Sequence, residues 1–128
     1  MVLVDADVLI ECLRGSPVAN NWLTTLSDEM VAIPGVVAME LFMGCRNQSE
    51  LQQVQRFLSA FTPVWPEALE FERGYHLLLS YRLSSGLSIP DALIAAIALV
   101  RGVRLYTFNV KHFQLITGLD VRQPYERP

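Results

Sequence analysis

The sequence predicts an α/β fold in which a parallel sheet of about five short strands carries helices on both faces. Two observations support this prediction. Short apolar runs rich in valine and leucine alternate along the chain with helical patterns of about ten residues or more. These runs are also too uniformly apolar for strands with one solvated face, whereas strands of a parallel sheet are covered on both sides. No repeat or linker interrupts the 128 residues, so we expect a single domain over residues 1–128.

The first half of the chain is expected to contain two strands and the helices that follow them. Prolines and glycines mark where several of these elements begin or end. The predicted elements are a strand over 1–4, a helix over 8–13, a helix from Pro17 to about Ser27, a strand over 30–33, a helix from Gly35 to about Gly44, and a helix over about 50–61 capped by Ser49.

The second half repeats the alternation of strands and helices. Its helices have clear ends, because "SSG" at 84–86 follows the first and Gly102 follows the second. The predicted elements are a strand over 63–65, a long helix from Pro66 to about Leu83, a helix from Ser88 to Val100, a strand over 103–107, a helical turn over 110–115 and a last strand over 119–121.

Composition excludes several classes of protein. Hydrophobic residues make up 52% of the chain, but no apolar run reaches the roughly 18 residues of a membrane span. Cys12 and Cys45 do not have the spacing of metal ligands, and no signal peptide precedes the first strand, so a cytoplasmic location is the expectation. The net charge of −3 argues against nucleic-acid binding by bulk positive charge, although locally grouped arginines would still suit phosphate contact.

Two aspartates follow the first predicted strand. Asp5 and Asp7 lie where the apolar run 1–4 ends and a helix begins. Open α/β sheets bind their ligands at the carboxyl ends of the strands, so this pair is a candidate site. Asp5 or Asp7 would equally serve as the N-cap of the helix that starts near Val8.

Two further acids stand alone in apolar segments. Glu40 is the only charge from Val31 to Cys45, and it lies in the second turn of its helix, where no cap is needed. Asp91 is the only charge between Ser88 and Val100. Ser88 and Asp91 also have the spacing of a capping box, so a structural role for Asp91 stays open.

Together these acids point to metal-dependent chemistry. Asp5, Glu40 and Asp91 should all lie at strand ends or in early helix turns along one edge of the sheet, and clustered carboxylates bind a hard divalent cation. Such an ion suits phosphodiester hydrolysis, since it can activate water and neutralise charge on the phosphate. We expect Asp5 and Asp91 to be direct ligands, and Glu40 to bind through water or to act as the base that orients the attacking water.

Four motifs in order, "VDADVLI", "AMELFMG", "IPDALIAAIAL" and "LYTFNVKHF", resemble those of the PIN-domain nucleases, most closely the VapC toxins of toxin-antitoxin pairs. The resemblance covers nearly the whole chain. It implies a Mg²⁺- or Mn²⁺-dependent ribonuclease whose three metal-site acids are Asp5, Glu40 and Asp91. A fourth acidic or amide position of the family falls on Asn109. Because an amide is neutral, the resemblance leaves open whether one metal ion is bound or two.

The resemblance also implies partners: an RNA substrate, a homodimeric second copy, and a cognate antitoxin, a small VapB-like DNA-binding protein. Basic residues placed for phosphate contact are Arg46, Lys111 and His112, although a solvated surface role is the simpler interpretation of each. Thr107, at the end of the fourth predicted strand beside Asn109, is placed to bond a ligand carboxylate or water, although a structural role is the simpler interpretation.

Two alternatives remain. The chain would be a non-catalytic PIN-like RNA-binding module if Asn109 disables the site. A haloacid-dehalogenase-type phosphatase shares the opening "DADVL", but that class needs a later lysine and a paired acidic motif. The only lysine, Lys111, has no such pair before it.

Overall fold

The computed structural model describes residues 1–128, and its five strands form one fully parallel sheet in the order β3-β2-β1-β4-β5. The central strand pairs with β2 on one side and with β4 on the other, and all of its residues are buried. The predicted fold class is therefore confirmed. The strands are β1 (Val2–Val4), β2 (Val31–Pro34), β3 (Thr62–Val64), β4 (Arg104–Tyr106) and β5 (Val121–Arg122).

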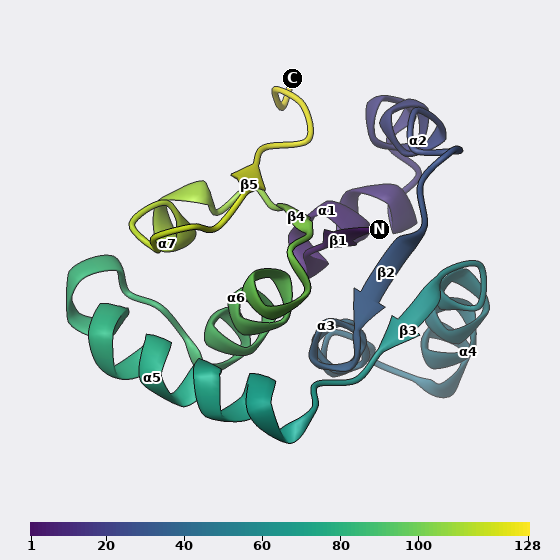
Figure 1. Ribbon diagram of the computed structural model, residues 1–128. Coiled ribbons are helices and arrows are strands. Elements are labelled where there is room, and N and C mark those ends of the chain that lie inside the picture. The colour runs from purple at the N-terminus through teal and green to yellow at the C-terminus, as the bar shows by residue number, and fades with distance from the viewer.

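Helices cover both faces of this sheet (Figure 1). The chain moves outward from β1 to β3 and then returns to β4 and β5, so right-handed crossovers place the connections of its two halves on opposite faces. On one face α5, α6 and α7 pack together, and on the other α1 packs against α2. The helices are α1 (Ala6–Leu13), α2 (Pro17–Thr24), α3 (Gly35–Met43), α4 (Gln48–Leu58), α5 (Ala68–Ser85), α6 (Ile89–Arg101) and α7 (Val110–Phe113).

The most deeply buried helix is α6. Every residue from Ala92 to Ala98 is buried, because the helix lies between the sheet and α5 (Figure 1). The alanines at several of these positions let the helix axis approach its neighbours closely. This burial fixes the start of the helix, where Asp91 lies. No helix of the structure combines the length and the apolar character needed to cross a bilayer.

Several boundaries differ from the predicted ones for identifiable reasons. Helix α4 begins at Gln48, because the side chain of Asn47, and not that of Ser49, accepts a hydrogen bond at the helix start, from the Glu50 N–H. Helix α5 begins two residues later than expected, because Glu67 and Glu70 form a capping box. Strand β5 begins two residues later than the predicted 119–121, because its two residues pair with the last two of β4.

A buried ion pair joins α5 to α6. Glu70 is only 2% exposed, and its two carboxylate oxygens accept hydrogen bonds of 2.7 and 2.9 Å from the Arg101 guanidinium. Arg101 also donates to the backbone carbonyl of Trp65 at 3.1 Å. The hydrogen bonds from Arg101 hold the pKa of Glu70 below its usual range. The pair therefore ties the first turn of α5 to the last turn of α6.

Replacing Arg101 with alanine should lower the free energy of unfolding near pH 7 by about 2 to 3 kcal/mol, because the buried Glu70 carboxylate loses its charged partner. The folded-state pKa of Glu70 is lowered, so the pair stabilises the protein above the unfolded pKa of 4.5 and this contribution is lost as the pH falls through the folded pKa. The difference between wild type and variant should therefore shrink in acid. Urea denaturation at several pH values measures it.

The matched control is Arg56→Ala, which removes an exposed arginine of α4 that forms no ion pair. Its effect should stay below about 0.5 kcal/mol. If Arg101→Ala costs no more than this control, the ion pair does not stabilise the helix packing.

Candidate functional site at the carboxyl edge of the sheet

The pairing of β1 with β4 brings Asp5 beside Thr107. The two strands are parallel, with Val4 opposite Tyr106, and the Asp5 N–H donates to the Tyr106 carbonyl at 2.9 Å. Helix α1 starts directly after Asp5, whose side chain accepts a hydrogen bond of 2.8 Å from the Ala6 N–H. Asp5 is thus the N-cap of α1, and the alternative that Asp7 caps this helix is wrong.

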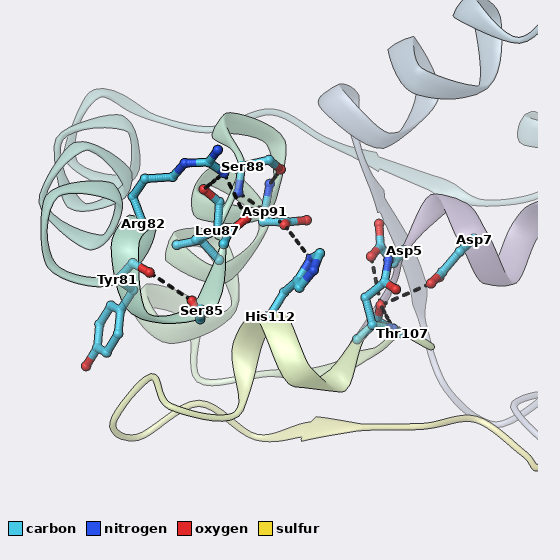
Figure 2. A network of polar contacts seen from close by, with 12 residues as sticks. Asp5, Asp7, Tyr81, Arg82, Ser85, Leu87, Ser88, Asp91, Thr107 and His112 are labelled. Atoms are coloured by element: carbon cyan, nitrogen blue, oxygen red, sulfur yellow. Dashed lines mark hydrogen bonds and ion pairs between the residues drawn. The ribbon is translucent and has the colours of Figure 1, made fainter.

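Thr107 connects both aspartates. It is fully buried, and its hydroxyl donates to Asp5 Oδ2 at 2.8 Å while lying 3.4 Å from Asp7 Oδ2 (Figure 2). The Thr107 hydroxyl oxygen also accepts a hydrogen bond of 3.1 Å from the Asn109 N–H. A hydroxyl has one hydrogen, so the shorter contact, to Asp5, is the stronger one. Thr107 therefore holds the Asp5 carboxylate in place, which is the less favoured of the two roles that its position at a strand end indicates.

Asp7 has one satisfied oxygen and one without a partner. Its Oδ2 accepts a hydrogen bond of 3.1 Å from the Phe108 N–H, but Oδ1 is buried and makes no hydrogen bond. A buried carboxylate oxygen without a donor is costly, and binding a cation is one way to satisfy it. Asp7 is therefore a candidate member of the site, and not only a residue of the first turn of α1.

The electrostatics of the site favour a positive charge. Burial, followed by the negative charge of Asp7, raises the pKa of Asp5 to about 7, although the hydrogen bonds from Thr107 and Ala6 oppose this rise. Burial also raises the pKa of Asp7. Glu40 is exposed by surface area, but desolvation by the protein atoms around it, and then the charges of Asp91 and Asp7, raise its pKa in the same way. These carboxylates repel one another, so the site gains from taking up protons or a cation.

Asp91 has the capping role considered for it in the sequence, and it also contacts His112. It forms a capping box with Ser88, in which each backbone N–H donates to the other side chain at 3.2 Å. The same oxygen, Oδ2, lies 3.2 Å from His112 Nδ1. Figure 2 shows Asp91 and His112 pointing toward each other beside the group formed by Asp5, Asp7 and Thr107. The effect of Asp91 on the pKa of Glu40 indicates that its charge reaches the site as well.

The sequence places His112 for phosphate contact or on a solvated surface, but it does not indicate a contact with Asp91. In the structure the His112 ring contacts Asp91. Helix α7 brings it there, since the His112 N–H donates to the Asn109 carbonyl in the first turn. Its position three residues after Asn109 is the one signal in the sequence that places it near the site.

The side chains of Glu40 and Asn109 are held by fewer contacts than those of Asp5, Asp7 and Asp91. Both side chains are exposed, and neither makes a hydrogen bond. Glu40 projects from α3, and Asn109 joins the network through its backbone N–H. Their side chains are therefore free to turn toward a ligand.

The donor atoms fit a hard divalent cation. Carboxylate oxygens, with the amide oxygen of Asn109, are the ligands that Mg²⁺ and Mn²⁺ prefer. The partnerless oxygen of Asp7 and the raised pKa values of Asp5 and Glu40 agree with such an ion. No three Asp, Glu, His or Cys side chains converge closely enough to hold a metal as they stand. Thr107 fixes Asp5, while Ser88 and His112 hold Asp91, so closure around an ion requires side-chain movement.

Comparison with known proteins points to one family. The family model of the PIN domain matches residues 2–117. Ribonuclease VapC10 of Mycobacterium tuberculosis is 36% identical over 130 residues, which cover 100% of this chain and 96% of the relative. Ribonuclease VapC19 of the same organism is 37% identical over 130 residues, which cover 98% and 100%. These similarities extend over the whole chain and are not confined to one motif.

Solved structures give the same result for the fold. A toxin-antitoxin complex from Klebsiella pneumoniae contains a chain that superposes with a TM-score of 0.79 at 29% identity, covering 99% of this chain and 100% of that one. A DNA-bound VapBC complex from Salmonella typhimurium gives a TM-score of 0.84 over 98% and 100%, and at 20% identity it supports the fold alone.

Asp5→Asn should stabilise the metal-free protein above neutral pH by an amount on the order of 2 kcal/mol. The folded pKa of about 7 lies above the unfolded value of 3.8, so the wild-type carboxyl stabilises the fold in acid and this contribution is lost as the pH rises through 7. An asparagine keeps the cap of α1 but does not titrate. Thermal melting in EDTA across this pH range tests the expectation.

Asp28→Asn, in the exposed segment between α2 and β2, is the matched control and should change the melting temperature little at any pH. Added Mn²⁺ should raise the melting temperature of wild type more than that of Asp5→Asn, because an ion that binds only the folded state stabilises it. An Asp5→Asn protein that melts below wild type above neutral pH in EDTA would contradict the repulsion between the acids.

Proposed function

Because the chain belongs to the PIN-domain family, we propose that it is a ribonuclease that hydrolyses RNA phosphodiester bonds with a bound divalent cation. The observation that carries this proposal is the gathering of Asp5, Asp7, Glu40 and Asp91 at one edge of the sheet, in a chain similar over its full length to proteins named ribonucleases. The resemblance drawn from the four motifs is confirmed by the family match.

Within this proposal each acid has its own task. Asp5 and Asp91 hold the cation, Mg²⁺ or Mn²⁺, and the buried Asp7 oxygen adds negative charge on the same side. When bound, the cation supplies positive charge where negative charge develops on the phosphate in the transition state. Thr107 keeps Asp5 from rotating away, because its hydroxyl fixes one carboxylate oxygen and leaves a further lone pair on it.

Glu40 is the proposed base. Its carboxylate makes no hydrogen bond, and its raised pKa makes it a better proton acceptor near neutral pH than an ordinary glutamate. In this role it accepts a proton from the water that attacks phosphorus. Asn109 has a neutral amide oxygen and orients water or ligand without adding charge.

The proposed partners are those of a toxin in a toxin-antitoxin pair: a VapB-like, DNA-binding antitoxin and a second copy of the chain. The solved toxin-antitoxin complex from Klebsiella pneumoniae and the DNA-bound VapBC complex support this proposal by analogy. Apolar residues exposed at every fourth position along α5 support a protein partner as well, since such a face is unusual on a lone monomer. These residues are Phe71, Tyr75, Leu79 and Leu83. Because the proposed substrate is RNA, we propose that the protein acts in the cytoplasm.

The purified protein should cleave single-stranded or looped RNA in Mg²⁺ or Mn²⁺, and EDTA should abolish cleavage. Asp5→Asn and Asp91→Asn should each lower kcat/KM by at least about a hundredfold, because each removes a charged ligand. Gel-based cleavage assays measure this, with Asp28→Asn as a control that should remain active. Undiminished cleavage by both site variants, prepared free of contaminating nuclease, would disprove the proposal.

A second candidate function, a non-catalytic RNA-binding module, is favoured by one observation, the neutral side chain of Asn109. Asn109→Asp should tighten Mn²⁺ binding, since a charged oxygen ligand replaces a neutral one. Calorimetry measures the dissociation constant. An unchanged or weaker affinity would show that Asn109 does not contribute to the ion site, and RNA binding without cleavage by wild type in Mn²⁺ would favour the binding module.

A further inference from the structure

The residues after β5 form a segment that is anchored beside the acidic site. This C-terminal strap, residues 123–127, turns away from β5 toward α2 (Figure 1). Tyr125 anchors it, with its ring centroid 5.2 Å from that of Phe108 and 6.2 Å from that of Trp22. Trp22 in turn packs edge-on against Tyr106, the last residue of β4, at 5.0 Å. Aromatic packing thus fixes the strap to the strand that ends at the site.

Phe108 links the strap to the carboxylates directly. Its backbone N–H donates to Asp7 Oδ2, and its ring carries the guanidinium of Arg127, with Cζ 3.9 Å from the ring centroid. Arg127 is therefore stacked on the same residue whose backbone N–H is bonded to Asp7.

The guanidinium of Arg127 has no polar partner in the protein. It forms no hydrogen bond and no ion pair, whereas Arg46, Arg101, Arg104 and Arg122 are each paired with a carboxylate. Stacking occupies one face of the planar group and leaves its N–H donors, which lie in that plane, free toward solvent. Its orientation is already restricted, so little side-chain entropy is lost when it binds a bidentate anion.

A site built from four carboxylates repels a polyanion unless positive charge lies nearby. Lys111 is another exposed cation near the site, and Arg14 and Arg46 line the same pocket as Glu40, but none of the three is stacked on an aromatic ring. Arg127 combines proximity to Asp7, a fixed orientation and unoccupied donors. An RNA phosphate has the charge and the paired oxygens that such a group binds best.

We propose that Arg127, seated on Phe108, is a substrate-binding residue that contacts a phosphate of the RNA strand next to the bond that is cut. This inference rests on the proposed ribonuclease function. It assigns the C-terminal strap to the RNA-binding surface, where Tyr125 positions the backbone and Arg127 makes the contact.

The test compares Arg127→Ala, Arg127→Lys and the control Arg56→Ala with wild type. Arg56 is also exposed and unpaired, but it lies near the end of α4, which leads into β3 at the opposite edge of the sheet. Binding of a short fluorescein-labelled single-stranded RNA is followed by anisotropy in EDTA at several salt concentrations, and cleavage kinetics are measured in Mn²⁺. Melting temperatures confirm that each variant is folded.

Arg127→Ala should weaken RNA binding by about tenfold and raise KM more than it lowers kcat. The slope of log affinity against log salt should become shallower by about 0.7, the value for one phosphate contact on a single strand. Arg127→Lys should keep the slope but recover only part of the affinity, because lysine retains the charge without the planar stacking. Arg56→Ala should match wild type.

An unchanged salt slope and KM in Arg127→Ala, with RNA cleavage by wild type intact, would overturn the role of Arg127 and leave the ribonuclease proposal standing. Equal losses in Arg127→Ala and Arg56→Ala would also overturn it, because the effect would then be general electrostatics. Failure of wild type itself to bind or cleave RNA would overturn both proposals.

Discussion

The hydrogen bond from the Thr107 hydroxyl to Asp5 Oδ2 links the ends of β1 and β4 beside the site, and Asp7 and Asn109 are connected to the same hydroxyl. Asp5 and Thr107 are separated by 102 positions along the chain, yet the parallel pairing of β1 and β4 makes them neighbours. The same junction starts α1, which brings Asp7 to the Phe108 N–H. A topology in which β1 and β4 were not adjacent would disperse these groups.

The site also shows how a fold can tolerate buried charges of one sign. The apolar core beneath the carboxyl edge provides the stability, while short hydrogen bonds from Thr107, Ala6 and Phe108 offset part of the cost of burying Asp5 and Asp7. The remaining cost appears as raised pKa values. Raised pKa values of this kind are typical of functional sites. A carboxylate that binds a cation or transfers a proton lies where burial and neighbouring charges make its ionised form less stable than it is in water.

Much of the fold could be predicted from the sequence, because it depends on local signals. The valine-rich run of β1, Gly102 at the end of α6 and the Ser88–Asp91 spacing each indicate an element or a boundary without reference to the rest of the chain. Helix starts were missed where a less obvious residue makes the cap, as at Asn47. Sheet order is a long-range property, so the alternation of elements alone could not supply it.

The site was predictable in its charges but not in its contacts. Isolated acids in apolar segments stand out in a sequence, which is why Asp5, Glu40 and Asp91 can be selected from the residue pattern alone. For Thr107 and His112 the sequence indicates only a position near Asn109, because their partners, Asp5 and Asp91, lie far away along the chain. The Arg127 contact with Phe108 is similarly invisible, because it depends on how the chain turns after β5.

The capping box at the start of α6 affects how an inert form of this protein should be made. One oxygen of Asp91 both caps the start of α6 and contacts His112. Replacing Asp91 therefore disturbs the start of the helix as well as the site. At Asp5, by contrast, an amide still serves as the N-cap of α1, because asparagine is as good a cap as aspartate. An inactive variant for studies of assembly therefore keeps the native structure better when Asp5, which follows β1, is replaced than when Asp91, on α6, is replaced.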